Sequence, residues 1–162
     1  MRLYSGQFRL MASEIIGALV ESELLEIPAE ALMEAELDVV GVFREYQRMD
    51  RQLSQLARDR TTNDGRSAEL KEKRRLAKEK NFRMGDDAIE YLVAQMLETF
   101  MHSPYVEEVY GEDREIRARI TPVIKKYTAS RDQELDVEVR SKIKNLEEGS
   151  TAWQIEDRKS VV

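Results

Sequence analysis

The chain has no cysteine and only one histidine, His102. Disulfides and thiolate chemistry are therefore excluded, and neither a zinc site of His and Cys ligands nor a histidine-based catalytic triad is expected. Glu98 lies four residues before His102 on one helix face, but a single Glu–His pair supplies too few ligands for a metal site. We interpret His102 as a helix-end residue and expect no metal, cofactor or small-molecule substrate.

Chain breakers and long apolar runs are also scarce. Three prolines and seven glycines in 162 residues favour helices over sheets, because sheets need many turns. No apolar run approaches the roughly 20 residues of a membrane helix. Glu14 interrupts the apolar start, which predicts a core helix and not a signal peptide. The sequence has no phosphate-binding glycine loop, nucleophile elbow or paired-carboxylate motif, so we expect a cytoplasmic all-α protein that is not an enzyme.

An apolar pattern recurs after 81 residues, half of the chain length. At this offset Arg2–Leu56 aligns with Arg83–Val137 without a gap. Few positions are identical, but the apolar positions coincide over two helices and the loop between them: Phe8 with Ile89, Met11 with Leu92, Ile15 with Met96, Leu19 with Phe100, and Val39 with Ile120. We interpret this pattern as a tandem repeat of two related helical hairpins. They span residues 1–60 and 84–146, with a basic connector at 61–83 and a tail at 147–162.

Each hairpin is predicted to contain a shorter and a longer helix. The first shorter helix begins near Phe8, and a loop at Glu26–Pro28 follows it. The second, over residues 87–102, ends at Ser103–Pro104, since the residue before proline disfavours helical geometry. A long helix is expected over 113–146. The long helix of the first hairpin has apolar residues at alternating steps of three and four, typical of a partly coiled-coil-like seam: Val39, Val42, Tyr46, Met49, Leu53 and Leu56.

This seam is the candidate partner surface. A hairpin of two helices cannot bury both apolar faces alone, so either the hairpins pack on each other or the seam recruits another chain. The long, highly charged helices favour the second outcome, and we predict a homodimer to which the Val39–Leu56 seam contributes. The halves differ here, since Glu134 stands where the first has Leu53. Tyr46 and Tyr127 occupy equivalent places and are expected to be buried rings whose hydroxyls reach polar partners.

The connector carries eight basic and four acidic side chains and is predicted to be a helix that Ser67 caps. Basic helices attract phosphate through counterion release. However, no aromatic residue interleaves the basic ones before Phe82, and the glutamates would pair with lysines and weaken the field. We interpret the connector as a solvated linker helix, with contact to nucleic acid or to an acidic protein partner as the alternatives. The candidate nucleic-acid contacts are Arg66, Lys71, Lys73, Arg74, Arg75, Lys78, Lys80 and Arg83.

Three stretches resemble a known bacterial family: the start Met1-Arg2-Leu3, the Ile/Leu-rich stretch Ile15–Ile27 and the Glu-Tyr helix Phe43–Leu53. They are similar to the domain-of-unknown-function family 507, and the resemblance would cover both hairpins as a tandem. The second copy departs from the pattern, with Lys126 where the first has Glu45. The resemblance implies a small bacterial cytoplasmic helical protein without an established activity, and it supplies no site residues.

These observations lead to a functional hypothesis and one alternative. The chain is expected to be a non-enzymatic helical protein-interaction or scaffold module, which recognises its partner through a groove or a helix face. The alternative is a nucleic-acid-associated protein that uses the basic helix at residues 66–83.

Overall fold

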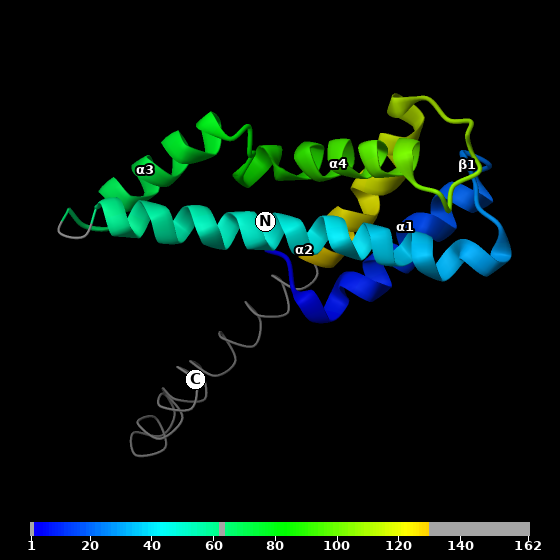
Figure 1. Cartoon of the computed structure of the whole chain (residues 1–162), viewed down its shortest axis with the longest axis horizontal. Coiled ribbons are helices and arrows are strands. Elements are labelled where there is room, and N and C mark those ends of the chain that lie inside the picture. Colours follow the sequence, from blue (N-terminus) through cyan, green and yellow to red (C-terminus); the bar gives the residue numbers. More distant parts are fainter. Residues whose placement is uncertain (1, 62–63, 130–162) are drawn as a thin grey trace, which may run out of the picture.

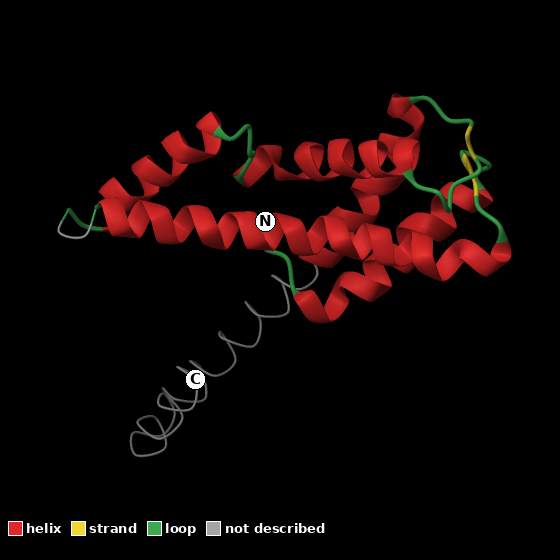
Figure 2. Cartoon of the chain, viewed as in Figure 1, coloured by secondary structure: helices red, strands yellow, loops and turns green. Residues whose placement is uncertain are grey.

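The computed structural model describes residues 2–61 and 64–129, and this part of the chain is almost entirely helical (Figures 1 and 2). The prediction of an all-α fold is confirmed. Two very short strands and three single-turn 3₁₀ helices (η) complete the described part. In chain order the elements are η1 (Ser5–Gln7), α1 (Phe8–Glu21), β1 (Leu25–Glu26), η2 (Ala29–Ala31), α2 (Leu32–Arg60), α3 (Arg66–Glu79), η3 (Gly85–Asp87), α4 (Ala88–His102), β2 (Glu108–Val109) and a final helix over residues 113–129.

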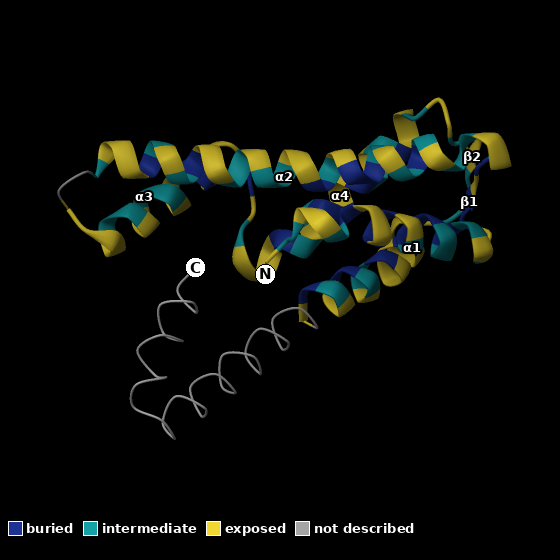
Figure 3. Ribbon diagram, turned by 90° about the horizontal axis from the view of Figure 1, so that it is seen from below, coloured by how far each residue is buried: buried dark blue, intermediate teal, exposed yellow. Residues whose placement is uncertain are grey.

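Helix α2 is the axis of the molecule (Figure 1). Its 29 residues span about 43 Å at 1.5 Å per residue, roughly twice the length of α1 with 14 residues or α4 with 15. α1 and α4 pack along its N-terminal and middle parts, and α3 folds back over its C-terminal part. The burial of α2 follows this division, with buried positions continuing to its far end (Figure 3).

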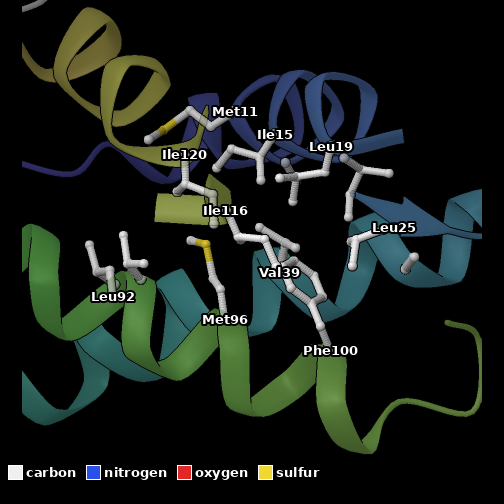
Figure 4. Packing of buried hydrophobic residues seen from close by; sticks show 14 of the residues in the cluster. Met11, Ile15, Leu19, Leu25, Val39, Leu92, Met96, Phe100, Ile116 and Ile120 are labelled. Atoms are coloured by element: carbon white, nitrogen blue, oxygen red, sulfur yellow. The ribbon is translucent and has the colours of Figure 1, made fainter. Parts of the chain in front are cut away.

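The main core lies where four helices meet. Side chains from α1 point toward those of the helix at residues 113–129 and of α4, with Val39 of α2 beside them (Figure 4). These helices form because their apolar residues recur every three or four positions and so share one face. The fully buried side chains include Phe8, Met11, Ile15, Leu19, Phe43, Leu92, Met96, Ile116, Ile120 and Ile124.

A second, smaller core lies between α2 and α3. Leu53 and Ala57 of α2 pack with Leu76 and Ala77 of α3 and with Phe82, which follows α3. The expectation of a solvated linker helix is therefore wrong: α3 is docked, with Leu76 only 2% exposed. It is docked because the apolar positions of α2 continue to Leu53 and Ala57, which pack against α3 and Phe82 and not in the main core.

The loops of the two halves are joined by a two-stranded antiparallel pair. Leu25 lies opposite Val109, and Glu26 lies opposite Glu108. The turn after β2 packs closely on the first loop: a Cβ added at Gly111 would lie 2.8 Å from the Leu24 Cδ2 atom. A side chain at position 111 would therefore force the buried Leu24 to move. Sequence patterns did not predict these strands, because two residues are too few to show alternation.

Several predicted boundaries agree with the structure. α1 and α4 fall where the apolar spacing placed them, α4 ends before Ser103, and the last described helix begins at residue 113. Its predicted continuation to 146 and the tail at 147–162 lie outside the described residues. The order helix, strand, helix occurs in both halves, but order alone does not establish a duplication, which stays a prediction. The predicted cap Ser67 lies inside α3, whose N-cap is Gly65.

The last described helix is tied to α1 by a polar contact at the surface. The Lys126 Nζ atom donates hydrogen bonds to both Glu14 carboxylate oxygens, at 2.6 and 2.7 Å, and the Tyr127 hydroxyl donates to Glu14 Oε1 at 2.9 Å. The hydrogen bond from Lys126, more than that from Tyr127, lowers the pKa of Glu14 below its ordinary value. The Tyr127 hydroxyl thus has the polar partner that was expected.

This contact predicts a pH-dependent contribution to stability. Because the pKa of Glu14 is lowered in the folded chain, the contribution is present above the unfolded pKa of about 4.3. It is lost as the pH falls through that value toward the lower folded pKa. We expect Glu14→Gln to reduce the free energy of unfolding by at most about 1 kcal/mol at pH 7, as for exposed ion pairs, and by progressively less toward pH 3. Urea unfolding of both proteins across this range measures the difference, and a gap that widens on acidification would contradict the assignment.

Candidate functional site

A cleft of about 1130 Å³ opens between α3 and α4, over the middle of α2. In Figure 1 these helices lie on the same side of α2 and are joined by the short loop that precedes η3. α2 contributes Tyr46 and Asp50, and Arg117 reaches the cleft from the helix at residues 113–129. The remaining lining comes from α3 (Leu70, Lys73, Arg74, Ala77, Lys78), from the loop and η3 (residues 81–87), and from α4 (Glu90, Tyr91, Ala94, Gln95).

Three aromatic rings form the floor of the cleft. Tyr46 lies 4.8 Å from Phe82 and 5.9 Å from Tyr91 between ring centroids, and Phe82 lies 5.2 Å from Tyr91. Rings this close pack directly on one another. They leave no space for a cation held between their faces, so the cluster is an apolar floor and not an aromatic cage.

The Tyr46 hydroxyl connects the aromatic cluster to the loop between α3 and η3. It donates a hydrogen bond to the backbone carbonyl of Arg83 at 3.3 Å, which is the polar partner expected for this ring. Burial, with a smaller contribution from the Asp50 carboxylate, raises the pKa of Tyr46 to about 12. Tyr46 is therefore a neutral donor at physiological pH and has no activated phenolate.

A helix-ending turn positions Phe82 in the floor. Asn81 adopts the left-handed backbone conformation, with φ at 55°, which asparagine tolerates better than most residues. The Phe82 amide then donates to the Ala77 carbonyl at 2.8 Å and the Asn81 amide to Lys78 at 3.3 Å. Together with the packing of the Phe82 side chain against Ala77, these two hydrogen bonds define a Schellman motif. The pair Asn-Phe after a helical stretch was the sequence signal for this turn, and it was missed.

Three of the eight basic residues predicted to contact nucleic acid are paired inside the chain. Lys73 Nζ lies 2.8 Å from Asp50 Oδ1, Arg75 pairs with carboxylates of its own helix, and Arg83 lies 3.8 Å from Glu90. The other five are exposed and form no ion pair with a carboxylate in residues 2–61 and 64–129: Arg66, Lys71, Arg74, Lys78 and Lys80. Of these five, Arg74 and Lys78 line the cleft.

The part of the cleft lining at the start of α4 carries acidic residues. Asp86 and Asp87 line the cleft immediately before α4, and Glu90 follows in the first turn. Carboxylates at a helix N-terminus are stabilised by the positive end of the helix dipole. The cleft therefore has the cations Arg74 and Lys78 on α3, unpaired within the described residues, and carboxylates at the start of α4, where Arg83 pairs with Glu90 and where Arg117 also lines the cleft.

The predicted partner seam of α2 faces the inside of its own chain. Val39 and Leu53 are 0% exposed; Val39, Val42 and Tyr46 contact the main core, and Met49, Leu53 and Leu56 belong to the second one. The seam is thus covered by α1, α3 and α4 and is not an open surface, because the long stripe is shared among several helices. Of its six residues only Tyr46 lines the cleft. The homodimer stays a prediction, but the buried seam is not available as its interface.

The His102–Glu98 pair lies outside the cleft, at the exposed end of α4. The His102 Nε2 and Glu98 Oε1 atoms are 3.1 Å apart. The described residues contain no group of three or more His, Cys, Asp or Glu side chains that could hold a metal ion. In the same part of the chain, no helix has the length and apolar character needed to cross a bilayer.

Fold and cleft together define a small all-α protein in which one docked helix completes a cleft on a long axial helix. The family model described as "Protein of unknown function (DUF507)" matches residues 1–160. The chain therefore belongs to this family, as the resemblance predicted. This single match spans both halves of the chain. No curated protein matches the chain.

Because α3 packs in a separate core, we expect it to detach from α2 and unfold locally while the main core stays folded. We expect Leu76→Ala to cost about 2–5 kcal/mol, the usual range for a buried leucine, and to act mainly on the docking of α3. Amides of residues 66–79 should then exchange with solvent much faster, whereas those of α1 should be little affected. Hydrogen exchange measured by mass spectrometry tests this, with Leu70→Ala as the control because Leu70 is 47% exposed. Equal loss of protection in α1 and α3 would show that they unfold as one unit.

Proposed function

We propose that the chain is a non-enzymatic protein-interaction module and that the cleft between α3 and α4 is its docking site. The observation that carries the proposal is the combination of the aromatic floor with Leu70, which is 47% exposed at the edge of the cleft. Apolar anchors that seat against such features supply most of the energy in protein interfaces. A cleft of about 1130 Å³ between two helices can accommodate a stretch of polypeptide, as in helix-in-groove recognition.

The charges of the cleft favour a protein over nucleic acid. Asp50, Asp86, Asp87 and Glu90 line it together with the basic residues, and carboxylates repel a phosphate backbone. The three floor rings are packed against one another, whereas binding of single strands relies on rings on which bases can stack. Nucleic-acid association through the basic helix is the alternative, and the five exposed basic residues outside internal ion pairs support it.

The proposal includes a cytoplasmic location and leaves a second copy of the chain among the candidate partners. A scaffold role fits the structure of α2, which carries separate cores at its two ends. An interaction at the α3 end can thus occur without disturbing the main core.

Site-specific crosslinking in living cells tests the proposal. A photoreactive phenylalanine analogue replaces Leu70 at the cleft or, as the control, Met101, which is 67% exposed on α4 and outside the cleft lining. After irradiation and nuclease treatment, we expect a discrete protein adduct from position 70 and none of the same mass from position 101.

Two results would contradict the proposal. Adducts of the same pattern from both positions would show contact without a specific site. Adducts from position 70 that nuclease removes would identify nucleic acid as the occupant and favour the alternative.

A further inference from the structure

We infer that the cleft accepts an acidic, amphipathic segment of a protein partner, with an apolar side chain against Leu70 and carboxylates on Arg74 and Lys78. The inference rests on the proposed function and specifies the chemistry of the partner. It depends on three features of the described residues: a row on α3, the unpaired positive charge of that row, and the carboxylates at the start of α4.

The row consists of Leu70, Arg74 and Lys78, all of which line the cleft. They are four residues apart, so on a helix they lie on one face, one above the other. A single exposed leucine on a protein surface needs no explanation. Here, however, Leu70 lies in a cleft with an apolar floor and begins a row whose other two members are cations. An occupant that contacts the whole row must carry an apolar group beside negative charge.

The positive charge of this row is not balanced inside the described chain. Neighbouring basic residues on α3 are paired, Lys73 with Asp50 across helices and Arg75 with Glu72 and Glu79 along the helix. Arg74 and Lys78 have no such carboxylate in residues 2–61 and 64–129. Like charges four residues apart on a helix repel each other, so an acidic occupant removes an unfavourable interaction as well as adding favourable ones.

The carboxylates at the start of α4 set the orientation of the occupant. Asp86 and Asp87 precede α4, and its dipole already stabilises them. They repel an acidic occupant that moves across the cleft and hold its carboxylates on the α3 side. A duplex or single strand carries phosphate along its whole length and cannot avoid these carboxylates, whereas an amphipathic segment presents acid on one side only.

Binding of fluorescent probes to the full chain tests the inference by anisotropy. The probes are a short acidic peptide with leucine anchors, the same peptide with serine at the anchors, its lysine-substituted counterpart and a single-stranded oligonucleotide. We expect the acidic leucine peptide to bind most tightly. Arg74→Glu with Lys78→Glu should weaken it roughly tenfold or more, from two reversed charge contacts. In the Leu70→Ser variant, the acidic peptide with leucine anchors should bind no more tightly than the acidic peptide with serine anchors.

Matched controls separate these effects from general changes in charge and hydrophobicity. Arg44→Glu with Arg51→Glu makes the same charge change at two exposed positions of α2, and Leu37→Ser removes another exposed leucine; all three residues lie outside the cleft lining. These controls should leave binding within about twofold of the unmodified chain, since distant exposed charges are largely screened by salt. Circular dichroism of every variant should match that of the parent, because all substituted residues are on the surface.

Three outcomes would overturn the inference. They are tightest binding of the oligonucleotide, equal binding of the leucine and serine peptides, and absence of binding by any acidic probe. Each can occur while crosslinking at position 70 still captures a protein. In that case the partner chemistry is wrong and the docking site stands. If crosslinking captures no protein at position 70, the proposed function itself fails.

Discussion

The length of α2 is the constraint on which the rest of the structure depends. Its 29 residues carry one apolar stripe, and helices of 14 and 15 residues cannot cover it. An exposed remainder would cost about 25 cal/mol for each Å² of apolar surface left in water. The chain solves this by folding α3 back, so that Leu76, Ala77 and Phe82 cover Leu53 and Ala57. Three ion pairs strengthen the contact at its edges, from Arg58, Arg60 and Asp50 to residues of α3.

The cleft follows from this arrangement. After α3 ends at Glu79, the chain turns back toward α2 before α4 begins at Ala88 (Figure 1), and Asn81 and Gly85 adopt the left-handed backbone conformation in this connection. Phe82 is thereby held against Tyr46 and Tyr91, and α3 and α4 are left as the two walls. The same residues that complete the second core thus form the floor of the candidate site. The contacts that stabilise the second core are also those that shape the candidate site.

The sequence predicted those parts of the fold that local patterns determine. Spacing at three and four residues placed α1 and α4, and Ser103–Pro104 marked the end of α4. The docking of α3 was missed because its composition is dominated by charge, and its apolar contacts depend on how far α2 extends. The cleft was missed for a similar reason: Tyr46, Phe82 and Tyr91 are brought together only by the packing of three helices. Among the predicted basic residues, sequence could not separate Arg74 and Lys78 from Lys73, whose partner Asp50 is on another helix.

Nuclear Overhauser effects between methyl groups test most directly whether α3 is docked on α2. We expect cross-peaks that join Leu53 or Ala57 to Leu76 or Ala77, because these residues form one buried cluster. Cross-peaks between Met11 and Ile120 of the main core serve as the internal reference. If the reference cross-peaks are present and those between α2 and α3 are missing, α3 is not docked, and neither the second core nor the cleft exists in solution.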